Sequence, residues 1–136
     1  MAVTANTEKI HKTEAEWREL LTPEQFHVMR DKGTDAPFRG ALLNNHEDGV
    51  YYCGACDAPL FTSDKKFESG SGWPSFWLPV SAEAIEAHDD NSLGAHRIEV
   101  TCRRCGAHLG HLFPDGPKPT GLRYCLNSTS LDFKKQ

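Results

Sequence analysis

Five cysteines carry the most evident chemistry in this chain, and their spacing divides them into four and one. Four of them form two Cys-x-x-Cys motifs, Cys53 with Cys56 and Cys102 with Cys105. Two such motifs supply four thiolates to one tetrahedral zinc ion. Four protein ligands leave no position open for water, so the predicted ion is structural and not catalytic. We therefore predict one structural Zn²⁺ per chain at these four cysteines.

The same two motifs could instead be redox-active dithiol pairs. A redox Cys-x-x-Cys motif usually lies at the start of a helix, which stabilises the thiolate. Here each motif follows a stretch that reads as a strand, Val50–Tyr52 before the first and a stretch ending at Thr101 before the second. This context favours zinc.

The fifth cysteine, Cys125, lies in the polar stretch Arg123–Ser128. In a strand alternate side chains share a face, so we expect Arg123, Cys125 and Asn127 on one face and the intervening residues toward the core. A nearby cation favours the thiolate, which is the nucleophilic form of cysteine. The alternative is that Cys125 is a small packing residue, as most free cysteines are.

Two histidines, His108 and His111, lie on either side of Gly110. In a regular strand they would point to opposite faces, so both reach one site only if the strand bends or bulges at the glycine. Histidine titrates near neutral pH and can donate a proton to a leaving oxygen. The competing interpretation is that at least one of them is an ordinary structural residue.

A glycine-rich turn over residues 70–77, with glycines at positions 70 and 72, presents Trp73 next to a proline. The two glycines allow backbone conformations that other residues rarely adopt. An indole face is a good surface for a methyl group or a thioether. The alternative is that Trp73 is an ordinary core residue.

The composition indicates one globular domain and excludes several classes of function. The chain has 136 residues, of which 38% are hydrophobic and 25% charged, enough for one core. Its net charge of -4, with basic residues in scattered small groups, argues against binding to nucleic acid or to an anionic membrane. The polar N-terminus shows no signal peptide, and no apolar run is long enough for a membrane span. Zinc-spaced cysteines with one free thiol suit a reducing compartment, so we expect a cytoplasmic protein.

Two short helices are predicted near the N-terminus, after a flexible arm at residues 1–13. Capping-box patterns at residues 13–16 and 22–25 predict helices over about 14–21 and 23–32, the second stopping at Gly33. We expect their apolar residues to cover one end of a sheet. These residues are Trp17, Leu20, Phe26 and Met29.

About eight short strands, punctuated by glycine and proline, are predicted after residue 49. They include Val50–Tyr52, Pro59–Phe61, Ile85–His88, His96–Thr101, His108–Phe113, Leu122–Asn127 and Ser130–Phe133. The expected fold is mainly β: a small, mostly antiparallel domain over residues 14–134 with a helical N-terminal cap.

Taken in order, the motifs of this chain resemble those of the peptide-methionine (R)-S-oxide reductases, the MsrB family. The resemblance rests on both Cys-x-x-Cys pairs and on residues 70–76, 108–116 and 123–128, and it extends over about residues 14–134. It implies a β-tent-like fold of two small antiparallel sheets, with the zinc site distant from the active site.

The resemblance also implies a catalytic role for three residues. Cys125 would attack the sulfoxide sulfur of methionine-R-sulfoxide, free or in proteins, and become a sulfenic acid. His111, helped by His108, would hydrogen-bond to the sulfoxide oxygen and protonate it.

Further roles, and one departure, follow from the same resemblance. Trp73 would pack on the substrate methyl group, while Arg123 and Asn127 would orient and polarise the site. Many members of the family carry a resolving cysteine at the position of Ser71. A serine forms no disulfide, so this chain would be a one-cysteine enzyme reduced directly by thioredoxin, glutaredoxin or a small thiol.

Three other functions agree less well with the sequence than a reductase does. A zinc-ribbon-like binding module for nucleic acid or protein is disfavoured by the acidic charge. A cysteine hydrolase using Cys125, a histidine and Asn127 is disfavoured because such nucleophiles lie at helix N-termini or sharp elbows, not within a strand. A non-catalytic ligand-binding module of the same fold would leave the shared face of Arg123, Cys125 and Asn127 without a use.

Overall fold

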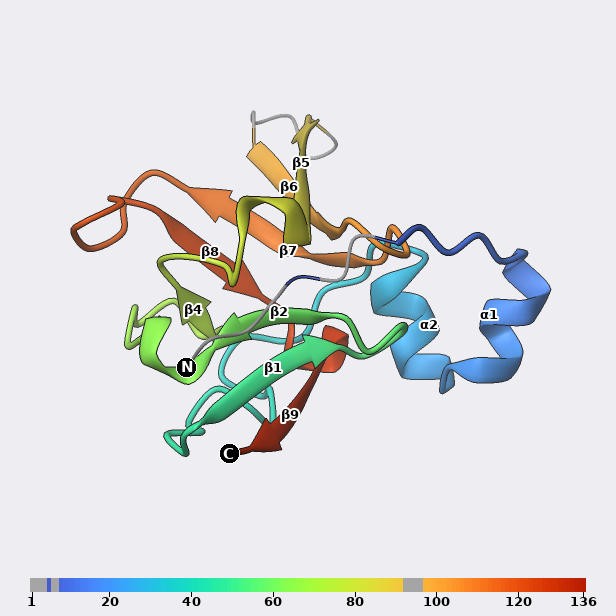
Figure 1. The fold of residues 1–136 in the computed structure, drawn as a ribbon, viewed down its shortest axis with the longest axis horizontal. Helices are drawn as coiled ribbons and strands as arrows, with labels where there is room; N and C mark the ends of the chain where they lie inside the picture. Colours follow the sequence, from blue (N-terminus) through green and yellow to red (C-terminus); the bar gives the residue numbers. More distant parts are fainter. Residues whose placement is uncertain (1–4, 6–7, 92–96) are drawn as a thin grey trace.

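The structure is a computed structural model that describes residue 5, residues 8–91 and residues 97–136. In these residues two short helices are followed by nine strands in two antiparallel sheets (Figure 1). The mainly β architecture predicted from the sequence is therefore confirmed. Among the described residues, no helix has the length and hydrophobicity needed to span a membrane.

The two helices begin where their capping boxes predict. Helix α1 (Glu14–Leu20) is capped by Thr13 and α2 (Pro23–Met29) by Thr22, each with the reciprocal side-chain bond from the third helical residue. Helix α2 ends three residues before the predicted boundary. The amide of Gly33 bonds the carbonyl of His27, and Lys32 has a φ of 59°, so the chain turns out of the helix here.

Three of the four apolar residues expected to cover one end of a sheet are buried. These are Trp17, Phe26 and Met29, whereas Leu20 is 60% exposed, so the expectation was wrong for Leu20. The reason is the end of α1: Leu21 adopts an extended conformation and turns into the core in its place.

The first sheet has three strands in the order β2-β1-β9, and the second has six in the order β3-β4-β8-β7-β6-β5. Their bounds, in chain order from β1 to β9, are Gly49–Cys53, Pro59–Thr62, Lys66–Phe67, Ser75–Phe76, Ile85–Asp90, Arg97–Cys102, His108–Phe113, Arg123–Leu126 and Leu131–Lys135. Short 3-10 helices lie at Ser63–Lys65, Ala82–Ala84 and Ser128–Ser130.

The two-residue strands β3 and β4 were not predicted from the sequence. Residues 75–76 were expected in a turn, because two residues carry too little pattern to indicate a strand. In the fold they pair with β8, with Ser75 opposite Cys125 and Phe76 opposite Tyr124. The predicted start of β6 at His96 lies outside the described residues.

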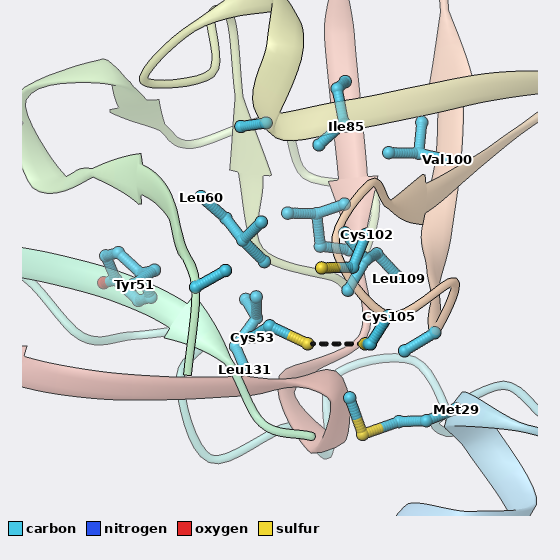
Figure 2. Packing of buried hydrophobic residues seen from close by; sticks show 14 of the residues in the cluster. Met29, Tyr51, Cys53, Leu60, Ile85, Val100, Cys102, Cys105, Leu109 and Leu131 are labelled. Carbon is cyan, nitrogen blue, oxygen red and sulfur yellow. Dashed lines mark hydrogen bonds between the residues drawn. The ribbon is translucent and has the colours of Figure 1, made fainter. Parts of the chain in front are cut away.

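The core lies between the two sheets and under α2 (Figure 2). Aromatic rings from both sheets meet in it. Tyr51 and Phe61 belong to the first sheet and Phe76 to the second. The ring of Phe76 lies 5.0 Å from that of Tyr51 and 4.7 Å from that of Phe61. Such contacts add to the burial of apolar surface and hold the sheets face to face.

Residues 8–10, in the region predicted as an arm, lie along the turn of the second Cys-x-x-Cys motif. The amide of Ile10 donates to the carbonyl of Arg104 at 2.7 Å, and Nζ of Lys9 donates to the carbonyl of Arg103 at 2.6 Å. The division into an arm and a catalytic domain stays a prediction.

Gly110 is required by the close approach of β7 to β8, because a Cβ there would overlap the carbonyl oxygen of Cys125 and lie 2.9 Å from Cα of Leu126. We predict that Gly110→Ala lowers the free energy of unfolding by about 2–4 kcal/mol. The control is Gly121→Ala, where φ is +71° but no atom would crowd the new Cβ, and a loss of about 1 kcal/mol is expected. Urea unfolding measures both, and equal losses would contradict the prediction.

Candidate active site and a four-cysteine cluster

The four motif cysteines meet where hairpins from the two sheets come together. Cys53 ends β1 and Cys102 ends β6, while Cys56 and Cys105 lie in the turns that follow. All four Sγ atoms lie within 4.8 Å of one another. The Sγ–Sγ distance is 3.6 Å both for Cys53 with Cys105 (Figure 2) and for Cys56 with Cys102. Zinc–sulfur bonds of about 2.3 Å in a tetrahedron give about 3.8 Å between sulfurs, so the cluster can hold a metal ion.

The charges in this cluster also fit a cation. Hydrogen bonds with the other three thiols, together with burial, raise the pKa of Cys53. Buried thiols this close cannot all ionise unless a positive charge lies between them. The short contacts join one motif to the other, as a shared ion requires and as two separate dithiol pairs would not.

A cavity of about 210 Å³ opens on the face of the second sheet that carries Cys125. Five of the six residues predicted for the active site line it: Trp73, His111, Arg123, Cys125 and Asn127. The cavity is also lined by four residues that were not predicted for the active site: Thr34, Ser71, Arg97 and Phe113. The predicted face of β8 is therefore observed, with Tyr124 and Leu126 buried on the other side.

The register of β7 and β8 sets the proposed acid beside the proposed nucleophile. His111 pairs directly with Cys125, and Phe113 with Arg123. Directly opposite residues of antiparallel strands place their side chains on the same face with Cβ atoms about 5 Å apart. His111 and Cys125 therefore face the same cavity as neighbours.

A bulge in β7 brings the two histidines together. Val100 pairs with Gly110 but the next residue, Thr101, pairs with His108, which leaves Leu109 without a partner. The extra residue breaks the alternation of faces, and the rings of His108 and His111 lie 5.4 Å apart. The condition stated from the sequence is thus met. His108, however, is only 2% exposed and lies behind His111, outside the cavity lining.

Each histidine is held by a buried carboxylate. Nε2 of His111 lies 2.8 Å from Oδ2 of Asp90, and Nδ1 of His108 lies 2.8 Å from Oε2 of Glu99. Burial lowers the pKa of His108, while the bond to Glu99 opposes the change. Because an ionised carboxylate only accepts hydrogen bonds, Nε2 of His111 carries the hydrogen in this contact, and Nδ1 is left for a ligand.

Arg123 is fixed by a two-pronged ion pair with Asp115. Its Nε lies 2.8 Å from Oδ1 and its Nη2 3.3 Å from Oδ2 of that residue. These bonds raise the pKa of Arg123. Its guanidinium also lies over the ring of Phe113, at 4.3 Å.

Burial dominates the ionisation of Cys125. The residue is 9% exposed, and desolvation raises the pKa of its thiol, while a hydrogen bond with Ser71 and the charge of Arg123 act in the opposite direction. Arg123 favours the thiolate, as expected from the sequence, but the effect of burial is larger. Arg123 shares its charge with Asp115, which itself disfavours the thiolate.

A loop residue, Asp35, connects Trp73 with Asn127. The indole Nε1 of Trp73 donates to the carbonyl of Asp35 at 2.9 Å, and the amide of Asp35 donates to Oδ1 of Asn127 at 2.9 Å. The other end of the Asn127 carboxamide donates to the carbonyl of Leu109. Thr129 anchors the Asp35 carboxylate through its amide and hydroxyl. Trp73 and Asn127 are therefore built into one wall of the cavity.

The carboxylates at positions 35, 90, 99 and 115 were missed as functional residues. Asp115 lies within a recognised motif, but an isolated Asp or Glu elsewhere gives no local signal of its partner. Asp90 and Glu99 lie on the neighbouring hairpin, so only the pairing of β5, β6 and β7 identifies them.

Comparison with known proteins points to one family. A SelR domain matches residues 21–135. A protein of Methanosarcina mazei named peptide methionine sulfoxide reductase MsrB is 58% identical over 128 residues, covering 94% of this chain and 91% of the relative. Proteins with the same name are 54% identical in Agrobacterium fabrum and 59% identical in Thioalkalivibrio sulfidiphilus. They cover 93% and 90% of this chain, and 93% and 89% of their own lengths.

The raised pKa of Cys125 predicts slow alkylation at neutral pH. We expect the rate of reaction with iodoacetamide to rise with pH to a midpoint above about 8.5, the ordinary value for cysteine. Arg123→Ala removes an influence that lowers this pKa, so its midpoint moves further up, whereas Asp115→Asn moves it down. Mass spectrometry of the Cys125 peptide measures the rate. A midpoint below that of a free thiol would refute the prediction.

Proposed function

The chain belongs to the SelR domain family, the family of peptide methionine sulfoxide reductase MsrB, and on this premise we propose that it reduces methionine-R-sulfoxide with Cys125 as the nucleophile. The observation that carries this proposal is the direct pairing of His111 with Cys125 at the edge of a cavity. This arrangement puts a nucleophile and a proton donor side by side, as oxygen transfer from a sulfoxide requires.

In the proposed step one oxygen atom passes from the sulfoxide to Cys125. The thiol gives its proton to Nδ1 of His111, and Sγ attacks the sulfoxide sulfur while His111 passes that proton to the sulfoxide oxygen. The resulting hydroxyl moves from the substrate sulfur to Sγ, so the substrate sulfur–oxygen bond and the transient sulfur–sulfur bond both break. This leaves the thioether of methionine and a sulfenic acid on Cys125. The substrate gains two electrons and Cys125 loses two. Because burial keeps Cys125 protonated, the thiol brings its own proton to the reaction.

Three further residues shape the proposed substrate complex. The indole of Trp73 packs on the methyl group bound to the sulfoxide sulfur, in an orientation set by its hydrogen bond to Asp35. Arg123 and Asn127 orient the site, and their contacts with Asp115 and with backbone groups hold them rigid. A fixed methyl pocket on one side and His111 on the other would select the R epimer.

Regeneration is proposed to use an external thiol. Ser71 lies 3.7 Å from Sγ of Cys125 but has no sulfur to offer, and the other four cysteines belong to the cluster. A first thiol would displace water from the sulfenic acid to form a mixed disulfide, and a second would release Cys125. Thioredoxin, glutaredoxin or a small thiol could do this, in the reducing cytoplasmic setting predicted from the sequence.

We further propose that the ion of the four-cysteine cluster is Zn²⁺. Cys53, Cys56, Cys102 and Cys105 would hold it, and four thiolates leave it no open position. It would supply a cross-link between the two sheets and take no part in the chemistry.

The alternative function is a non-catalytic, zinc-ribbon-like binding module. It accounts for the cluster but gives no use to the cavity in which His111 and Cys125 meet. Turnover measurements separate the two functions.

We predict that the chain converts the R epimer of methionine sulfoxide to methionine, with dithiothreitol as reductant, and leaves the S epimer unchanged. Cys125→Ser should lower the rate by about a thousandfold or more, because no other described cysteine reaches the cavity. Amino-acid analysis of the products of each separated epimer measures the rates.

The same protein without reductant gives the control. One equivalent of the R epimer should add the mass of one oxygen atom to the Cys125 peptide, and no disulfide should form. Absence of turnover for either epimer by the folded, metal-loaded protein would favour the binding module. A disulfide of Cys125 formed at the rate of turnover would refute the one-cysteine cycle.

We predict one zinc per chain by elemental analysis, and its loss in Cys102→Ser. Since the cluster joins hairpins of both sheets, this loss should lower the midpoint of thermal unfolding by about 10 °C or more. Cys125→Ser is the matched control and should keep both its zinc and its stability. Full stability of Cys102→Ser without metal would show that the cluster has no structural role.

A further inference from the structure

Three serine hydroxyls connect Cys125 to the interior of the second sheet. Oγ of Ser71 lies 3.7 Å from Sγ of Cys125 and 2.8 Å from Oγ of Ser69. Oγ of Ser69 lies 2.7 Å from Oγ of Ser75, which donates to the carbonyl of Trp73 at 3.1 Å. We call Ser71, Ser69 and Ser75 the hydroxyl chain.

The backbone holds this chain at both ends. Ser71 lies between Gly70 and Gly72, whose φ values of 74° and 98° favour glycine, so the turn presents the Ser71 side chain to Cys125. The amide of Ser71 donates to Oγ of Ser69. At the inner end Ser75 is 1% exposed and pairs with Cys125 across β4 and β8.

We propose that Ser71 is a catalytic residue whose hydroxyl is the hydrogen-bond partner of the Cys125 sulfur in both of its protonation states, with Ser69 and Ser75 setting its orientation. This inference rests on the proposed function, in which Cys125 is the nucleophile. It gives the serine that stands at the resolving position a role of its own in the oxygen-transfer step.

A hydroxyl suits this role because it both donates and accepts a hydrogen bond. With Cys125 protonated, the thiol donates to Ser71, and the chain continues through Ser69 and Ser75 to the carbonyl of Trp73. When the sulfur carries negative charge, rotation of the hydroxyls reverses the chain, and Ser71 donates to the sulfur. No heavy atom needs to move, so the chain can follow the reaction without reorganising the site.

Among the groups around the thiol, the Ser71 hydroxyl contributes strongly to the stability of the thiolate. Arg123 on β8 favours the thiolate but is bound to Asp115, which opposes it, while His111 faces the sulfur from β7. The hydrogen bond with Ser71 is the largest of the influences that lower the pKa of Cys125 against burial. Its loss should leave the thiolate and the transition state less stable.

The test measures the alkylation of Cys125 by iodoacetamide against pH in the full, zinc-loaded chain. Ser71→Ala should react about three- to tenfold more slowly below the midpoint, with the midpoint moved to higher pH, as expected for one hydrogen bond to a charged sulfur. Ser71→Thr keeps the hydroxyl and should react like the wild type. The rate of a single turnover with the R epimer should fall by a similar factor in Ser71→Ala.

Alkylation tests the role of Ser71, and turnover tests the proposed function, so the two can fail independently. Equal alkylation rates and midpoints for Ser71→Ala and wild type would overturn the role of Ser71, whatever the turnover. Ser69→Ala should give a smaller shift in the same direction, and no shift there would overturn the role of the chain behind Ser71. Failure of the proposed function would show itself differently, as undiminished turnover in Cys125→Ser.

Discussion

The four-cysteine cluster joins the two sheets through the turns that follow β1 and β6. The hairpin turn that carries Cys53 and Cys56 meets the turn that carries Cys102 and Cys105, and all four sulfurs come together. A metal ion bound here would restrain β1 and β6 together, and the aromatic contacts of Phe76 add to the interface between the sheets.

The strand that carries Cys102, β6, is connected to the candidate active site by strand pairing. Strand β6 pairs with β7 and β7 with β8, so the position of the cluster and the register of Cys125 belong to one hydrogen-bonded sheet. Two local features of β7 determine how its side chains and β8 are placed at the cavity. The bulge at Leu109 turns His108 and His111 toward each other, and the missing side chain of Gly110 lets β8 approach closely. An ion bound by the four cysteines would therefore support the site without contacting a substrate.

Within the cavity, burial and hydrogen bonding work against each other at Cys125. Burial disfavours the charged sulfur, and the groups that favour it are a guanidinium already paired with Asp115 and a serine hydroxyl. A thiol that stays protonated at rest resists oxidation and alkylation, because the thiolate is the reactive form. In the proposed reaction it would react when a sulfoxide places its oxygen near His111, so the balance that protects Cys125 would also make its reactivity depend on substrate.

The sequence by itself determined the parts of this protein that depend on residue type and short spacing. The two Cys-x-x-Cys motifs, the capping boxes at Thr13 and Thr22, and the common face of Arg123, Cys125 and Asn127 follow from local geometry, which neighbouring residues specify. Only the tertiary structure decided what lies across from them. The pairing of His111 with Cys125, the carboxylates that hold His108, His111 and Arg123, and the two-residue strand that brings Ser75 opposite Cys125 join residues far apart along the chain. Contacts of this kind depend on strand register and on the burial of the whole sheet, and no local pattern encodes either.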